Sequence, residues 1–307
     1  MRQMPGARIL LGALVSAAVL AAAAGTASAA ADPNFGNPAG HFRVPPAGRA
    51  VDTRRPNHVI GNGRAASCTS AAVVRDVAAG GIITFDCGPK PVTIVMQSTA
   101  SVVKTRHLVV LDGGGLVTLS GGGKRRILYS DTCAGHWSTD DCVNQPYPRV
   151  VVENITFEDG FDGTHQATCT ANIPACWYGG RCSNGGALSS ISVQWDVLNS
   201  EFTNNRAIGW GANPASPGTP GGGSGGAIYL DGRDDNVLIA GTVMGSNTAR
   251  EGGGAVFDVV DSGWGALTFN ESHLHDDTSG EFQTFPGVHY DLDGHDRPPV
   301  TINSTDN

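Results

Sequence analysis

The sequence of 307 residues is poor in charged and aromatic side chains. Only 16% are Asp, Glu, Lys or Arg, and 7% are Phe, Trp or Tyr. Glycine is abundant instead, with 43 residues and no collagen-like period. This composition argues against ordinary helical packing and indicates many tight turns between short strands.

Basic residues are also in the minority, with 20 Lys and Arg against 28 Asp and Glu. A nucleic-acid partner is therefore not expected, because such a partner needs a basic surface. The acidic balance favours solubility, suits divalent cations and is indifferent to neutral glycans.

The only long apolar run lies at the N-terminus. Arg2 and Arg8 precede it, it extends over 9–24, and small residues follow up to Ala31. This order is typical of a secretory signal peptide, so we expect residues 1–31 to be removed and the chain to be secreted. No later segment is apolar enough to span a membrane.

Seven cysteines in a secreted chain predict disulfides. Spacing favours Cys68 with Cys87 and Cys133 with Cys142, and it leaves three candidates for a last bridge and one odd thiol: Cys169, Cys176 and Cys182. A zinc site is not expected, because no Cys-x-x-Cys pair occurs.

The mature chain divides into two parts. Residues 32–64 are rich in Pro and Gly, which predicts a linker or a loosely packed lead-in, and residues 65–307 form one domain. In that domain 69–79 is predicted as a short amphipathic helix with a Ser/Thr cap, closed by Gly80 and Gly81. Short apolar runs bounded by turn residues then predict strands at 82–85, 92–96, 108–111, 117–119 and 127–129.

The second half of the chain repeats. Three copies of Gly-Gly-Ala-aliphatic occur at 185–188, 225–228 and 253–256. A second strand follows, ending in Asn-x-Ala after Phe202 and Met244 and in a looser copy after Leu274. These three positions are 42 and then 30 residues apart, and the excess lies in one place. Insertions at a fixed phase are typical of a stacked solenoid.

These repeats resemble the pectate-lyase-like right-handed β-helix proteins, and more narrowly secreted actinobacterial β-helix proteins and polymorphic outer-membrane-protein repeats. The resemblance covers about residues 65–303 and implies an all-β fold. This fold is a single-stranded right-handed parallel β-helix with a short N-terminal capping helix. It places Phe157, Phe202, Met244 and Leu274 in a core stack and Asn205, Asn247 and Asp277 in a column of turns. There, Asn tolerates the left-handed conformation and bonds its neighbour one coil away.

Two insertions, 161–184 and 208–224, leave the repeat at the same phase and should project side by side. We predict that they wall a substrate-binding flank, with Trp177, Tyr178 and Trp210 as platforms for sugar rings. His165 and Arg181 complete this predicted set. The alternative is that the aromatic residues only pack their own disulfide-tied loop.

The predicted catalytic group is Asp159, Asp162, Arg206 and Arg250, which lie near the point where the insertions emerge. A polysaccharide lyase of this fold needs a Ca²⁺ cage of oxygens and a base. Hydrolysis is disfavoured, because Asn-Thr-Asp, Gly-His-Gly and Arg-Ile-Lys are absent; Trp-Ile-Asp-His, typical of pectate lyase, is absent too. Exposed carboxylates at turns are common in β-helices, so a structural role remains open.

Two further clusters, a pair of histidines and a run of basic residues, have simpler structural explanations. His273 and His275 flank the inward Leu274 on one strand face, but two ligands do not make a metal site, so the metal ligands stay unknown. The basic run 124–126 is predicted as a solvated turn.

Two functional classes therefore remain. The first is a secreted carbohydrate-active enzyme, a lyase rather than a hydrolase, which acts on an acidic polysaccharide with Ca²⁺ as the only suggested cofactor. The second is a non-catalytic surface or matrix protein that binds cell wall, glycan or protein. In both, the expected partner is extracellular or cell-wall polysaccharide and the chain is a monomer.

Overall fold

The computed structural model describes residues 35–42, 50–132, 147–163, 184–191, 193–209, 222–232, 236–260, 265–302 and 304. These residues contain one α-helix, α1 (Ser70–Ala79), one short 3-10 helix (Ala65–Ser67) and strands β1 to β22. The named strands pair in parallel throughout three sheets. The prediction of an all-β chain with parallel sheets and a short N-terminal helix is thus confirmed.

The largest sheet has twelve strands. Its main path is β1 (His58–Gly61), β2 (Gly81–Asp86), β5 (Leu108–Ser120), β7 (Arg149–Glu158), β10 (Gln194–Leu198), β14 (Asn236–Ala240), β18 (Ala266–Asn270) and β22 (Val300–Ile302). Beside this path lie β3 (Val92–Val95), β11 (Glu201–Thr203), β15 (Val243–Gly245) and β19 (His273–His275).

Two smaller sheets complete the architecture. The four-stranded sheet has the order β20 (Thr278–Ser279), β16 (Thr248–Ala249), β12 (Arg206–Ala207) and β8 (Phe161–Asp162). The six-stranded sheet has the order β21 (Val288–Leu292), β17 (Val256–Val260), β13 (Ile228–Gly232), β9 (Leu188–Ile191), β6 (Leu128–Asp131) and β4 (Ala100–Val102).

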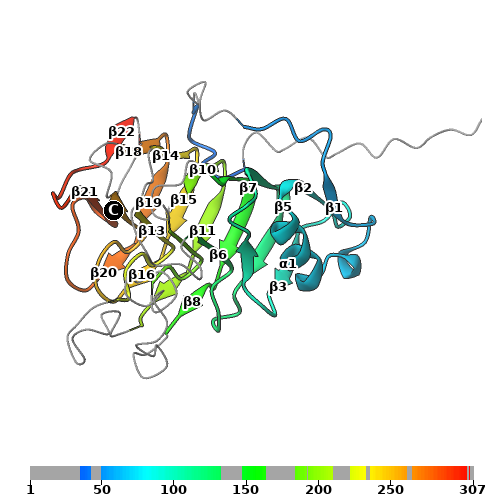
Figure 1. The fold of residues 1–307 in the computed structure, drawn as a ribbon, viewed down its shortest axis with the longest axis horizontal. Coiled ribbons are helices and arrows are strands. Elements are labelled where there is room, and N and C mark those ends of the chain that lie inside the picture. The colour runs from blue at the N-terminus through cyan, green and yellow to red at the C-terminus, as the bar shows by residue number, and fades with distance from the viewer. Residues whose placement is uncertain are drawn as a thin grey trace, which may run out of the picture.

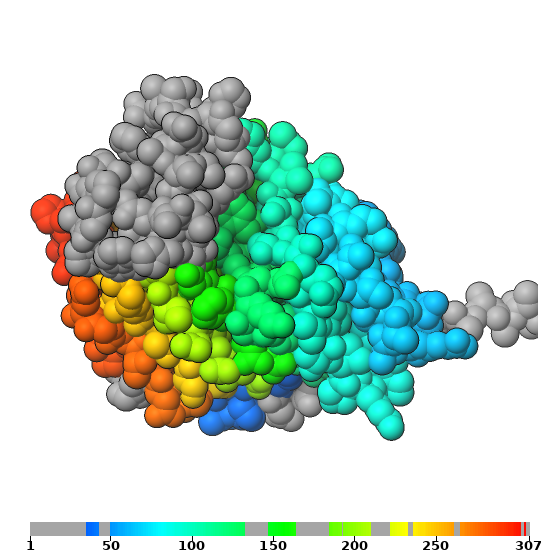
Figure 2. Space-filling model, turned by 90° about the horizontal axis from the view of Figure 1, so that it is seen from below, coloured from blue at the N-terminus to red at the C-terminus, as the bar shows by residue number. Residues whose placement is uncertain are grey.

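The chain visits these sheets in turn. From β10 and β11 it passes to β12, then to β13, and β14 pairs again with β10. We call one such passage a circuit. Figure 1 shows successive circuits side by side along the long axis, and Figure 2 shows them as bands from cyan to orange. Each circuit therefore packs mainly on the circuits before and after it.

Helix α1 begins and ends as the sequence predicts. The Thr69 side chain accepts a hydrogen bond from the Ala72 amide, and the helix stops at Gly80, whose φ of 75° is accessible to glycine. The helix lies beside β1 at one end of the sheets (Figure 1). The predicted disulfide between Cys68 and Cys87 is present next to it.

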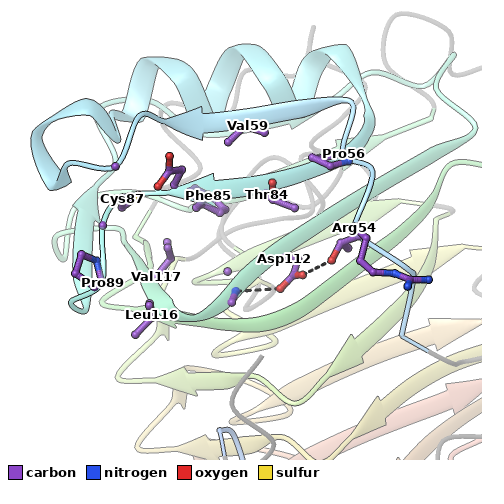
Figure 3. Close-up of a pocket in the computed structure, with 16 residues that line it drawn as sticks. Arg54, Pro56, Val59, Thr84, Phe85, Cys87, Pro89, Asp112, Leu116 and Val117 are labelled. Carbon is purple, nitrogen blue, oxygen red and sulfur yellow. Dashed lines mark hydrogen bonds between the residues drawn. The ribbon is translucent and has the colours of Figure 1, made fainter. Parts of the chain in front are cut away.

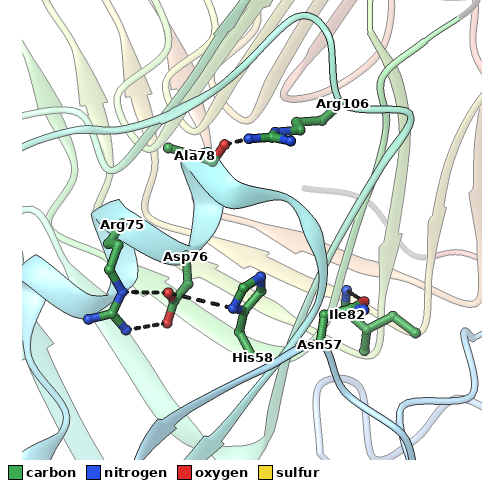
Figure 4. Close-up of polar contacts among 7 residues, drawn as sticks. All are labelled: Asn57, His58, Arg75, Asp76, Ala78, Ile82 and Arg106. Atoms are coloured by element: carbon green, nitrogen blue, oxygen red, sulfur yellow. Dashed lines mark hydrogen bonds and ion pairs between the residues drawn. The ribbon is translucent and has the colours of Figure 1, made fainter.

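Polar contacts fix the helix to the first strands (Figure 4). The Arg75 guanidinium donates to the buried Asp76 carboxylate at 2.7 Å, and Nδ1 of His58 lies 3.8 Å from the same carboxylate. Arg106 donates to the carbonyl of Ala78 at 3.1 Å. Arg75 and Asp76 both belong to α1, so His58 provides the link from the helix to β1 and Arg106 the link to the chain before β5. Strand β1 lies within the segment that the sequence predicts as a lead-in.

The predicted core stack is confirmed. Phe157, Phe202, Met244 and Leu274 occupy one register position on neighbouring strands, and each exposes 1% of its surface or less. The rings of Phe157 and Phe202 stack with centroids 4.8 Å apart. A parallel, in-register stack lets like side chains fill the interior at close-packed density.

The predicted column of turns is confirmed in its bonding. The side chain of Asn205 donates to Oδ1 of Asn247 at 3.0 Å, and that of Asn247 donates to Oδ1 of Asp277 at 2.8 Å. The left-handed conformation, however, falls on the preceding residues: Asn204, Ser246 and Asp276 have φ between 55° and 57°. The buried column therefore provides hydrogen bonds between circuits, while its neighbours provide the bend.

The Gly-Gly-Ala motif has a steric explanation. Its first glycine has a positive φ, 67° at Gly225, which other residues rarely adopt. Its second glycine lies against the next circuit, and a Cβ on Gly226 would come 2.0 Å from the carbonyl oxygen of Gly254. The motif thus marks a bend where the backbones of two circuits meet closely.

The described part of the lead-in is packed rather than loose. Phe42 and Val51 cover an apolar column on the outer face of the large sheet: Val110, Val151, Leu198, Leu238 and Ala240. The Asn37 amide donates to the carbonyl of Gly241 at 2.9 Å, far along the chain. The lead-in therefore runs across several circuits. In the described part of the chain, no helix is long and apolar enough to cross a membrane.

Candidate functional site

The two insertions leave the circuits at the same position, as predicted. Asp162 in β8 is in register with Ala207 in β12, and each strand leads into an insertion. The chain returns at equivalent turns, where the Gly185 amide donates to the carbonyl of Ser224 at 2.9 Å. The mouths of the insertions therefore lie on adjacent circuits.

Arg126 closes the mouth of the first insertion. Its side chain exposes 9% of its surface and pairs with Asp162, where the insertion starts. It also donates to the carbonyls of Asn184 and Gly185, where the insertion ends. The prediction of a solvated basic turn is thus wrong for Arg126, because burial of a guanidinium requires such partners.

Arg250 closes the mouth of the second insertion in the same way. Its guanidinium donates to the carbonyl of Gly209 at 2.7 Å and to that of Gly222 at 2.6 Å. Its donors thus bridge the two ends of the insertion. The sequence singles out Arg250 because it lies near the point where the insertions emerge. In the structure its side chain bonds to the backbone on both sides of the second insertion.

The four residues of the predicted catalytic group are not brought together. Asp162 is buried and paired with Arg126, whereas Arg206 is exposed and 5.9 Å from the Phe161 ring. Residues 161 and 162 are consecutive on a strand, so Arg206, in register with Phe161, faces away from Asp162. Asp159 lies in a turn and accepts from Asn204. A catalytic role for the group stays a prediction.

The predicted substrate-binding residues lie outside the described residues. These are His165, Trp177, Tyr178, Arg181 and Trp210, together with Cys133, Cys142, Cys169, Cys176 and Cys182. Their roles and pairings remain predictions.

The six-stranded sheet, which the chain reaches directly after each insertion, carries a ladder of aromatic rings. It comprises Tyr129, Tyr229, Phe257 and His289, which share one register column with Ser189 between Tyr129 and Tyr229. They face away from the core, because the alternate residues of these strands belong to the core cluster. The rings of Tyr229 and Phe257 stack at 5.3 Å.

Three carboxylates lie in the neighbouring register column, where they alternate with Ile191 and Val259: Asp131, Asp231 and Asp291. The hydroxyl of Tyr129 donates to Asp131 at 2.8 Å, and that of Tyr229 donates to Asp231 at 2.9 Å. We call these seven residues the aromatic–carboxylate ladder. Its four rings expose only 6–9% of their surface, so little of each ring is accessible to a ligand.

The sequence contained a signal for this ladder. Tyr-x-Asp follows the aliphatic residue of one Gly-Gly-Ala copy at 229–231 and recurs at 129–131, and His-x-Asp recurs at 289–291. Aligning the strand after the motif, rather than the motif alone, would have revealed it, since side chains at i and i+2 share a face.

The inner face of the same sheet contains an unusual acid. Asp258 is fully buried, and within the described residues neither of its oxygens has a hydrogen-bond partner. Burial, and secondarily the charge of Asp231, raises the pKa of Asp258 well above its ordinary value. Burial thus favours the protonated form of this carboxyl.

A second acidic pair lies beneath the lead-in. Asp112 and Glu153 are in register on β5 and β7, and Asp112 accepts from the hydroxyl of Thr53 at 2.6 Å. Burial, with the adjacent Asp112 charge, raises the pKa of Glu153 to about 8, against a smaller opposing effect of the Val51 amide. A carboxyl with a pKa raised in this way is a general candidate for acid–base chemistry.

Asp112, but not Glu153, lines a cavity of about 450 Å³ near the disulfide. Figure 3 shows the Asp112 carboxylate between the lead-in, with Arg54 and Pro56, and the bulge before Val117. Glu153 exposes 2% of its surface and bonds the lead-in backbone. The pair is therefore better suited to holding the lead-in than to contacting a substrate.

Metal-ligand side chains gather at one place in the part of the chain that the structure describes. His289, Asp291 and Asp296 offer ligand atoms within 4.8 Å of one another. The predicted pair His273 and His275 does flank the inward Leu274, with rings 5.1 Å apart, and His275 bonds Asp276.

Comparison with known proteins adds no relative. No family model matches the chain, no curated protein is similar to it, and no solved structure matches its fold.

Proposed function

We propose that this chain is a secreted right-handed parallel β-helix that binds a neutral extracellular polysaccharide without cleaving it. The right hand is supported by the parallel pairing of strands from successive circuits, since crossovers between parallel strands are right-handed almost without exception. Secretion is supported by the signal-peptide pattern of residues 1–31 and by the Cys68–Cys87 disulfide.

The observation that carries the binding proposal is the alignment of the two insertion mouths on adjacent circuits. Both insertions start from one register position and return directly into β9 and β13 of the six-stranded sheet. Two neighbouring insertions on one side of a solenoid form a wall, and such walls are where repeat proteins bind their partners.

The charge of the chain favours a neutral glycan. Its 28 Asp and Glu outnumber its 20 Lys and Arg, and an excess of carboxylates repels a uronate polymer. Aromatic rings contact the apolar faces of sugars. Because the ladder itself is nearly covered, the sugar platforms in this proposal are Trp177 and Trp210 of the insertions.

Cleavage is left out of the proposal because the titratable residues that the structure describes at the insertion mouths are engaged in structural contacts. Asp162 and Arg250 are engaged with Arg126 and with backbone carbonyls. The Asp112–Glu153 pair lies beneath the lead-in, on another sheet.

The test is affinity electrophoresis of the mature chain in gels that contain neutral or uronate-rich polysaccharides. We expect a neutral polymer to retard the unmodified chain. The double variant Trp177→Ala, Trp210→Ala should lose this retardation and keep its melting temperature. Trp264→Ala lies outside both insertions and should leave retardation intact. Absence of retardation by every neutral polymer, or its survival in the double variant, refutes the proposed surface.

Turnover is measured in parallel. A rise in ultraviolet absorbance from unsaturated product with Ca²⁺, or release of oligosaccharides, would favour the enzyme alternative instead. We expect neither on the polymer that retards the chain.

A further inference from the structure

We propose that His289, Asp291 and Asp296 form a binding site for a first-row divalent cation such as Zn²⁺, which ties the last complete circuit to the turn that follows it. The site shares His289 and Asp291 with the aromatic–carboxylate ladder, and it involves neither of the two insertions that carry the proposed glycan surface.

The three side chains come from one strand and one turn. His289 and Asp291 belong to β21, where residues two apart face the same side. Asp296 is brought back beside Asp291 by an antiparallel bridge. The turn between them is held by the Gly294 amide, which donates to Oδ1 of Asp291 at 2.7 Å.

The imidazole of His289 is held in position by neighbouring rings but makes no hydrogen bond within the described part of the chain. His289 exposes 6% of its surface, and its ring is held by Phe257 and Phe282, each with its centroid 4.7 Å away. Within the described residues its buried Nδ1 has no partner, and its Nε2 lies 3.7 Å from Oδ1 of Asp296. That separation is too long for a hydrogen bond. Nε2 is thus the ring nitrogen that faces Asp296 and is open to a ligand.

The separations fit a shared ion. Zn²⁺ binds imidazole nitrogen and carboxylate oxygen at about 2.0–2.2 Å, so two ligands of one ion lie no more than about 4.3 Å apart. The Nε2–Oδ1 separation of 3.7 Å is within this limit, and all three ligand atoms lie within 4.8 Å of one another. The side chain of Asp296 is 72% exposed and can turn toward the other two.

The donor set indicates the kind of cation. One imidazole with two carboxylates suits Zn²⁺ and its neighbours, whereas Ca²⁺ takes oxygen ligands only. A metal ion binds imidazole through the lone pair of a ring nitrogen. Three protein ligands leave a further position for water.

The experiment titrates the untagged mature chain with ZnCl₂ by calorimetry and follows its melting temperature. The background is His275→Ala, which removes the exposed pair of His273 and His275 as a competing site. We expect one Zn²⁺ per chain and a higher melting temperature with the ion, whereas CaCl₂ has neither effect.

Two variants in the same turn provide the comparison. Asp296→Asn removes an exposed ligand and should weaken Zn²⁺ binding at least tenfold and abolish the rise in melting temperature. Asp293→Asn is the control, because Asp293 has a φ of 54°, which Asn tolerates, and is not a ligand. No Zn²⁺ binding, equal binding by Asp296→Asn, or stabilisation by Ca²⁺ alone would overturn the assignment.

Discussion

The acid beneath the lead-in allows a quantitative prediction about pH. Glu153 exposes 2% of its surface and has a pKa of about 8, against an ordinary value of 4.5. Below pH 4.5 the carboxyl is protonated in both the folded and the unfolded chain, so it has no linked effect. Above pH 4.5 the unfolded chain releases the proton while the folded chain keeps it, and the free energy of unfolding falls by about 1.4 kcal/mol per pH unit up to the folded pKa.

Replacing Glu153 with Gln removes this titration. At pH 7, about 2.5 units above the ordinary pKa, the variant should be more stable by about 3 kcal/mol, and at pH 4 the two proteins should be nearly equal. The Gln side chain keeps an oxygen that accepts from the Val51 amide, now 3.1 Å from Oε2. The gain is an upper estimate, because a buried amide keeps its own desolvation cost.

The assay is urea unfolding of both proteins between pH 4 and pH 8, with Glu281→Gln as an exposed control that should change little. Parallel profiles for Glu153→Gln and the unmodified chain would refute the raised pKa. A variant that is less stable at pH 7 would show that Glu153 is charged and bound to a cation in the folded state.

The remaining predictions concern contacts between circuits and the acid in the core. Gly226→Ala should destabilise the chain by about 3 kcal/mol or prevent folding, because its Cβ would lie 2.0 Å from the carbonyl oxygen of Gly254. The control Gly123→Ala has nothing within 4 Å of its Cβ and should cost about 1 kcal/mol for its positive φ alone. Thermal denaturation measures both losses. Asn247→Ala should cost about 3 kcal/mol in urea unfolding, because it leaves buried partners in both adjacent circuits unbonded, and a loss under 1 kcal/mol would contradict the role of the column. The stability of the unmodified chain should decline as the pH rises above about 4, because the carboxyl of Asp258 then ionises in the unfolded chain but resists ionisation in the folded one. Asp258→Asn should remove this decline, and an unchanged pH profile would disprove the raised pKa.

The sequence predicted the local features of the fold well, because their causes are local. Thr69 and Gly80 bound the helix through cap geometry, and the spacing of Cys68 and Cys87 suits a short bridge. The core stack was predicted because Phe202, Met244 and Leu274 recur at one place in a repeat. A repeat converts short-range pattern into long-range register, since residues at the same phase become neighbours.

The site was harder to predict, because its partners are distant backbone groups. Arg126 binds carbonyls 58 and 59 residues away, and no side-chain pattern marks a carbonyl. The role of Glu153 depends on which segment covers it, and composition made the lead-in look like a linker. The left-handed positions fell one residue before the Asn column, because a buried amide that bonds both neighbours cannot also occupy the exposed bend.

The arginines at the insertion mouths have a consequence for how this chain can vary. Each guanidinium ties the two ends of an insertion, so the circuit beneath has the same geometry whatever is placed between them. Once the ends are fixed, doubling a flexible loop adds only about 0.6 kcal/mol of closure entropy. Arg126 and Arg250 therefore define two grafting points, at which segments of other length and specificity can be exchanged without rebuilding the scaffold.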